Sequence, residues 1–301
     1  MISGFTCGVR DATCVVRVCT ASVVLLTGIA GPRPPQQATY QNGAQTVAVY
    51  ATVIDRNGRL AANLTKTDFQ ILDNGQPADI TVFSNDLQPL TVALMLDTSY
   101  SMQPRLALVK DSTRRFIEAL QPGDRVRLGT FAEEVSVSPL LTGDKGVLQR
   151  VLDEEVWPGG TTPLWNAIDE AMNAFVHETG RRVVMTLTDG TNTDGAMPMD
   201  QVRARLIRDG FMVYMVGMPG TTLDHRAVDL ADETGGGHFE VPTPTGLSAT
   251  FAKVADELRH QYALGFTPIA LDGRVHTIDV RLTRPGLTAR ARRSYLAAQS
   301  H

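Results

Sequence analysis

The pattern of hydrophobic positions divides the chain into two kinds of segment. Between residues 90 and 260, short continuous apolar runs alternate with segments in which apolar residues recur every three to four positions. The continuous runs predict strands buried on both faces, and the three-to-four spacing predicts amphipathic helices. The expected strands are 91–96, 126–131, 182–188 and 211–216, and the expected helices are 106–120, 148–155, 163–178, 199–209, 224–233 and 247–260.

This alternation indicates the α/β class, with a Rossmann-like, doubly wound and mainly parallel sheet covered by helices on both faces. In such sheets ligands bind beyond the carboxyl ends of the strands. Asp97 and Asp189 each follow an apolar strand directly. We therefore expect the topology to bring these two distant carboxylates to one edge of the sheet.

The segments on either side of this region have β character. Residues 46–54, 69–72 and 80–83 read as strands separated by Asn-Gly turns, and 262–266, 276–282 and 288–295 read as three more. Because two or three isolated strands are marginally stable, we expect the two groups to pair with each other. The predicted division is a signal peptide or anchor (1–30), a linker (31–44), an N-terminal β unit (45–87), the α/β domain (88–260) and a C-terminal β segment (261–297).

The first thirty residues have the pattern of an export signal. Two arginines precede an apolar run that ends in Gly28-Ile29-Ala30, a plausible cleavage site. The alternatives are a short N-terminal anchor or a start placed too early. All three cysteines (Cys7, Cys14 and Cys19) lie here, so neither disulfides nor thiolates serve the rest of the chain. We expect an exported protein, in the periplasm, the cell envelope or the medium, with no membrane span in its mature part.

Charge narrows the classes of partner. The 301 residues carry a formal net charge of −4 and contain no basic run. This argues against nucleic acid and against an anionic membrane surface as partners.

The segment after the first expected strand is the strongest candidate for chemistry. It reads Asp97-Thr98-Ser99-Tyr100-Ser101. In an extended loop, residues two apart point the same way, so Asp97, Ser99 and Ser101 can offer three oxygen ligands to one point. Oxygen ligands suit Mg²⁺ best, with Mn²⁺ or Ca²⁺ as alternatives.

Two later segments can complete such a site. Gly159-Gly160-Thr161-Thr162-Pro163 precedes an expected helix, whose first position suits Pro163, and one of its threonine hydroxyls can face the same edge. Leu187-Thr188-Asp189-Gly190 ends a strand in a carboxylate followed by a turn glycine.

In this order, the three motifs resemble the von Willebrand factor A domain with its metal-ion-dependent adhesion site. The resemblance covers residues 90–260, including Thr-Gly-Gly-Gly-His-Phe at 234–239. The flanks at 63–69 and 261–266 are similar to those of exported bacterial proteins related to this domain.

The resemblance implies roles for five metal-site residues. Ser99 and Ser101 would bind the metal through their hydroxyls, and Asp97 and Asp189 would act directly or through water. Thr161 would engage when the site is occupied. Thr162 is the alternative for that role, although its place before Pro163 suits a helix N-cap better.

The function implied is recognition: an exported, Mg²⁺-dependent module that captures an acidic residue of a partner protein. The alternative is a structural component of an envelope assembly, in which the metal only holds loops together. We expect no enzyme activity and no small-molecule substrate, since no general base, nucleophile or second metal is placed near the site. A phosphatase of the haloacid-dehalogenase type would need an aspartate where Ser99 stands, and neither a P-loop nor a dinucleotide-binding glycine motif is present.

Other residues have simpler interpretations. Asp194 could be a ligand but fits a solvated loop turn better, and the six histidines show no metal-ligand spacing. Trp157 and Trp165 are expected in the core, with Trp157 on a binding surface as the alternative. Tyr100, between the two serines, could contact a partner.

Overall fold

A computed structural model describes residues 46–299 apart from 191, 194 and 196. The predictions for the signal or anchor (1–30), the linker (31–44), the three cysteines and Asp194 fall outside the described residues. All described residues belong to one unit of the chain.

The central sheet has six strands, and its buried strands are those that the apolar runs predict. Its order is β10-β9-β8-β5-β6-β7, and every neighbouring pair is parallel except β6 and β7. β5, β8 and β9 are buried along their whole length. The bounds are β5 (Thr91–Asp97), β6 (Arg125–Phe131), β7 (Val135–Val137), β8 (Val183–Thr188), β9 (Met212–Gly217) and β10 (Gly237–Phe239).

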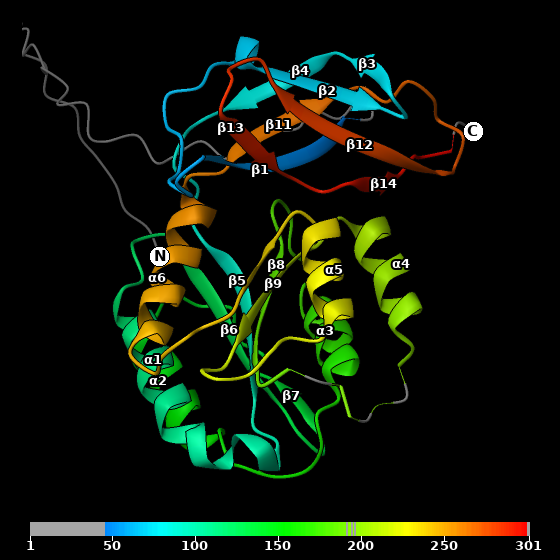
Figure 1. Cartoon of the computed structure of the whole chain (residues 1–301). Coiled ribbons are helices and arrows are strands. Elements are labelled where there is room, and N and C mark those ends of the chain that lie inside the picture. The colour runs from blue at the N-terminus through cyan, green and yellow to red at the C-terminus, as the bar shows by residue number, and fades with distance from the viewer. Residues whose placement is uncertain (1–45, 191, 194, 196, 300–301) are drawn as a thin grey trace, which may run out of the picture. The chain divides into compact units, whose positions relative to one another are not determined.

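Six α-helices occur among the described residues. They cover the two faces of this sheet (Figure 1). One face packs against α1, α2 and α6, and the other packs against α3, α4 and α5. The bounds are α1 (Leu106–Glu118), α2 (Lys145–Glu154), α3 (Leu164–Asn173), α4 (Met199–Asp209), α5 (His225–Glu233) and α6 (Gly246–Arg259). The fold is therefore the doubly wound α/β arrangement that the sequence predicts.

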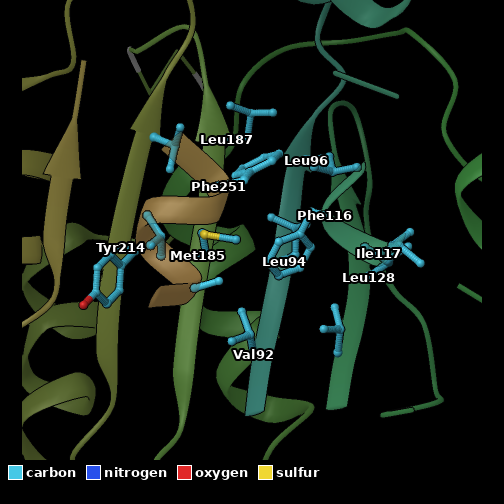
Figure 2. Close-up of a cluster of buried hydrophobic side chains, with 14 of the residues drawn as sticks. Val92, Leu94, Leu96, Phe116, Ile117, Leu128, Met185, Leu187, Tyr214 and Phe251 are labelled. Carbon is cyan, nitrogen blue, oxygen red and sulfur yellow. The ribbon is translucent and has the colours of Figure 1, made fainter. Parts of the chain in front are cut away.

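The core on the α1 side shows why the strands lie where they do. Figure 2 shows Leu94 and Leu96 of β5 beside Met185 and Leu187 of β8, with Phe251 of α6 packed over them. All of these side chains are buried. Full burial of one such side chain is worth about 1.5–3 kcal/mol, so this core fixes the strand ends from which the candidate site projects.

The segments on either side form two four-stranded sheets, with orders β13-β1-β11-β4 and β14-β12-β2-β3. Both sheets combine strands from the start and the end of the described chain, which meet in the antiparallel pairs β1–β11 and β2–β12. This confirms the expected pairing of the tail with the N-terminal strands. The bounds are β1 (Val47–Asp55), β2 (Phe69–Asp73), β3 (Gln76–Ala78), β4 (Ile80–Ser84), β11 (Tyr262–Phe266), β12 (Val275–Leu282), β13 (Leu287–Arg290) and β14 (Ser294–Leu296).

Some expected boundaries were wrong. α2 begins at Lys145, three residues early, because the Asp144 carboxylate caps it by accepting from the Gly146 and Val147 amides. α3 ends at Asn173 rather than at 178. The expected strand 288–295 is two strands, β13 and β14. The short strands β3, β7 and β10 were not predicted, since three residues are too few to show a period.

Candidate metal centre

Asp97 is the most deeply buried member of the candidate site. It is the last residue of β5 and is fully buried. Its Oδ1 accepts a hydrogen bond from the Ser99 amide at 2.9 Å, and its Oδ2 accepts one from the Thr188 hydroxyl at 2.7 Å. Because β5 and β8 are paired, the ends of these two strands lie side by side. The carboxylate is thus held in one orientation by a neighbour in sequence and a neighbour in the sheet.

The surroundings of Asp97 disfavour its charge. Burial raises the pKa of this carboxyl above its ordinary value, and hydrogen bonds from Ser99 and Thr188 oppose the shift only in part. The negative charge of Asp189 adds to the rise in the pKa of Asp97. A cation bound between the two carboxylates would favour their charged forms.

The two serine hydroxyls meet, but not in the way the sequence analysis expected. Ser99 Oγ lies 3.1 Å from Ser101 Oγ. An extended loop was the expected geometry, and that expectation was wrong: a 3₁₀ helix, η2 (Tyr100–Arg105), begins directly after Ser99. The hydroxyls come together because Ser99 is the N-cap of η2 and Ser101 lies in its first turn.

Backbone hydrogen bonds join the Gly-Gly-Thr segment (residues 159–161) to the loop at residues 97–101, called the serine loop below. The Gly159 amide donates to Thr98 O at 2.8 Å, and the Tyr100 amide donates to Gly160 O at 3.1 Å. Gly160 has φ +72°, and a Cβ there would lie 2.1 Å from the Glu133 nitrogen. Only glycine fits this position. The close contact of Gly160 with the Glu133 backbone therefore fixes the position of Thr161, the next residue.

The two candidate threonines occupy different environments. Thr161 is exposed, whereas Thr162 is buried. The Thr162 amide donates to Thr193 Oγ1 at 2.9 Å. Pro163 is the N-cap of α3 rather than its first residue, so the predictions of Pro163 at the first position and Thr162 as the cap were wrong. The side chain of Asn192 instead accepts from the Trp165 amide at the helix start, at 3.3 Å.

Asp189 follows β8 directly and lies near a cation of the chain itself. Arg105, the last residue of η2, places its Nη1 3.9 Å from Asp189 Oδ2 and donates to Ser101 O at 3.4 Å. Gly190 has φ +131°, and a Cβ there would lie 2.4 Å from Thr222 O, so the turn after Asp189 also requires glycine. Arg105 therefore ties the serine loop to the loop after β8.

The donor set fits a hard divalent cation. The gathered side chains offer carboxylate and hydroxyl oxygens, which are ligands typical of Mg²⁺. No group of three or more His, Cys, Asp or Glu residues with metal-binding geometry occurs among the described residues. A site here would thus depend on the serine and threonine hydroxyls, with two carboxylates to balance the cation's charge.

A polar hollow of about 420 Å³ borders Thr161 on the α3 side. Glu133, Asp169 and Glu170 contribute to its lining. Asp169 is already paired with Arg205 at 2.7 Å, and Glu170 Oε2 accepts from the side-chain Nδ2 of Asn173 at 2.8 Å. Glu133 and Glu170 therefore add negative charge on the α3 side of the site, whereas Arg105 adds positive charge on the η2 side.

The two tryptophans and two of the histidines differ from one another in exposure and contacts. Trp165 is buried, as expected, but the default prediction for Trp157 was wrong, because 67% of it is exposed. His238 lies 3.1 Å from the Asp232 carboxylate, and His260 lies 3.1 Å from that of Asp256. Both histidines are exposed and stand outside the three metal-site motifs of the sequence.

Two residues near the site were missed by sequence reasoning. Thr188 stands in the Thr-Asp-Gly motif at the end of β8. Because β8 was expected to lie near β5 in a parallel sheet, a hydrogen bond from Thr188 to Asp97 could have been predicted. Arg105 had no such signal, because its approach to Asp189 depends on the length of the 3₁₀ turn.

Comparison with protein families identifies the class. The model of the von Willebrand factor type A domain matches residues 91–253, which is more than half of the chain. The chain therefore belongs to the von Willebrand factor type A domain family. Domains of this family are typically interaction modules, mostly without catalytic activity, and they commonly bind divalent cations at a metal-ion-dependent adhesion site.

Several solved structures are similar to parts of this chain. A von Willebrand factor type A protein from Catenulispora acidiphila has a TM-score of 0.52 at 13% identity, covering 87% of this chain and 76% of that one. An aerotolerance-related membrane protein from Bacteroides fragilis has a TM-score of 0.46 at 20% identity, and the match covers 56% of this chain and 99% of that one. The PilB minor pilin from Streptococcus sanguinis has a TM-score of 0.48 at 12% identity, and the match covers 59% of this chain and 63% of that one. The likeness to the Catenulispora acidiphila protein, at 13% identity, concerns the fold alone.

No curated protein matches the chain. Within the described part of the chain, every helix is too short or too polar to cross a bilayer.

Proposed function

We propose that this chain is a Mg²⁺-dependent protein-binding module that captures an acidic residue of a partner. The observation that carries the proposal is the convergence of three loops at the carboxyl ends of β5 and β8. The serine loop, the Gly-Gly-Thr segment and the turn after Asp189 are joined by the hydrogen bonds and the Arg105 contacts given above. Sites of this kind in α/β sheets lie at this edge.

In this proposal each residue has a role that its position supports. Ser99 and Ser101 hold the cation through their paired hydroxyls, and Asp97 and Asp189 balance its charge. Thr161, exposed on the Gly-Gly-Thr segment, is placed to engage when a ligand is present. The bound cation supplies a position that accepts a carboxylate oxygen. Mn²⁺ or Ca²⁺ can serve in place of Mg²⁺ in the same proposal.

Calorimetry tests the metal site directly. Titration of Mg²⁺ into the wild-type chain should fit one site, and Asp97→Ala should remove the binding heat while the circular dichroism spectrum stays unchanged. Equal binding by both proteins would overturn the assignment of Asp97.

The second test separates capture from a merely structural metal. EDTA should release a partner captured from envelope extract, and a carboxylate-bearing partner should tighten Mg²⁺ binding, since coupling between two ligands is reciprocal. If a bound partner leaves the Mg²⁺ affinity unchanged, the metal only holds loops together, as a component of an envelope assembly.

Export belongs to the same proposal and rests on residues 1–30, outside the described part. Sequencing the N-terminus of the mature protein checks it: a start after residue 30 supports cleavage, and an intact Met1 contradicts it.

A further inference from the structure

Two exposed aromatic side chains stand beside the candidate metal centre. Tyr100 is 68% exposed and Trp157 is 67% exposed, the highest values among the exposed large hydrophobic residues of the described chain. Tyr100 lies between the two candidate serine ligands, and Trp157 precedes the Gly-Gly-Thr segment by two residues. Exposed aromatic residues are enriched at interaction sites, because they bury a large area and lose little conformational entropy on binding.

Both loops are held in place. The Tyr100 amide donates to Gly160 O, and the Trp157 indole Nε1 donates to Glu154 O at 2.7 Å. The indole nitrogen is therefore already satisfied within the chain, which leaves the ring surface for apolar contact. A fixed ring is a better anchor than a mobile one, since binding orders less of the protein.

Two cationic side chains lie on this side of the site, although the exposed acidic residues 153–155 come just before Trp157. Lys110 of α1 places its Nζ 5.2 Å from the Trp157 ring centroid, and the Arg105 guanidinium, with a side chain 35% exposed, lies beside Asp189. With a divalent cation balanced by Asp97 and Asp189, Arg105 leaves an excess positive charge beside the candidate ligands. A partner with a single acidic group and apolar neighbours complements such a surface.

We propose a docking surface formed by Tyr100, Trp157, Lys110 and Arg105. Its ligand is an extended segment of a partner protein, in which an acidic residue has an apolar residue close to it in the sequence. This inference rests on the proposed function, because the acidic residue is the one that the cation would accept. The cation then fixes orientation, and the aromatic pair supplies the contact area and the preference for one neighbouring side chain over another.

A displayed library of random heptapeptides with a fixed central aspartate tests this surface. The full chain is immobilised in Mg²⁺, and bound phage are eluted with EDTA. Selection on the wild type should enrich peptides with an apolar residue within two positions of the aspartate. On the double variant Tyr100→Ser/Trp157→Ser that preference should disappear, and the best wild-type peptide should bind about tenfold more weakly or worse.

Val176→Ser is the matched control, because Val176 is 62% exposed and lies away from the motifs, just after α3. It should select the same peptides as the wild type. Melting temperatures of all variants establish that they are folded.

Each outcome decides between the claims. Enrichment of peptides without any apolar preference overturns the docking surface and leaves the metal-dependent capture standing. Peptide binding that EDTA does not release overturns the proposed function. A wild-type dimer that Trp157→Ser dissociates, seen by sedimentation, would assign the aromatic pair to a second copy of this chain and also overturn the docking surface.

Discussion

Arg105 is the residue whose charge most directly affects the candidate site. Its guanidinium lies 3.9 Å from the Asp189 carboxylate, so it competes for the same negative charge as a divalent cation would. We expect Arg105→Ala to bind Mg²⁺ about tenfold more tightly, because a unit charge at several ångströms contributes about 1–2 kcal/mol of repulsion in a partly hydrated site.

Calorimetry measures this effect, with Arg115→Ala as the matched control. Arg115 lies on α1 and pairs with Asp111 at the surface, so its removal should leave the Mg²⁺ affinity unchanged. Weaker Mg²⁺ binding by Arg105→Ala would contradict the competition and show that the loop contacts of Arg105 matter more to the site than its charge.

Tyr295 is the residue where we expect a stability effect far from the metal centre. Its hydroxyl donates to Asp73 Oδ2 at 2.8 Å, and His276 Nδ1 lies 2.8 Å from Asp73 Oδ1, all three residues being buried. Tyr295→Phe leaves the carboxylate with one donor fewer. A hydrogen bond to a charged group is worth about 1.5–3 kcal/mol, and urea unfolding should show a loss of this order.

Tyr100→Phe is the control for that measurement. Its side chain is exposed, so removing the hydroxyl should change the free energy of unfolding by no more than about 0.5 kcal/mol. Equal effects of the two substitutions would show that the Asp73 network adds nothing to stability.

At the scale of elements, the Gly-Gly-Thr segment offers a matched pair of substitutions. A Cβ on Gly160 would lie 2.1 Å from the Glu133 nitrogen in a backbone with positive φ, whereas a Cβ on Gly159 would meet nothing within 4 Å. We expect Gly160→Ala to cost about 1–3 kcal/mol of stability and to weaken Mg²⁺ binding, because the loop that carries Thr161 must move.

Gly159→Ala should leave both the stability and the Mg²⁺ affinity close to those of the wild type. Thermal denaturation with and without Mg²⁺ measures the two variants side by side. If they behave alike, the position of this loop does not control the site.

Much at this scale could be predicted from the sequence. The apolar runs located β5 and β8, and parallel topology then placed Asp97 and the turn after Thr188 at one edge of the sheet. The sequence could not show that η2 follows Ser99 or that Asn192 caps α3, because both depend on contacts between loops distant in the chain. For the same reason, the exposure of Trp157 was predicted only as the alternative to a core position, and the approach of Arg105 to Asp189 was not predicted.

At the scale of the molecule, strands from both ends of the described chain share two sheets. β1 pairs with β11 and β13, and β2 pairs with β12. Ending the chain at residue 260 would leave β1 and β2 without these partners, and unpaired strand edges promote aggregation. We expect the truncated protein to be insoluble or to bind a dye for exposed apolar surface, and a soluble monomer with native strand content would contradict this.

The central claim is that one divalent cation binds where the serine loop, the Gly-Gly-Thr segment and the turn after β8 meet. The most direct measurement is anomalous diffraction from crystals grown with Mn²⁺. We expect a single strong peak within coordination distance of Ser99 Oγ and Ser101 Oγ, and no such peak in Asp97→Ala. A peak elsewhere, or none at saturating Mn²⁺, would contradict the account.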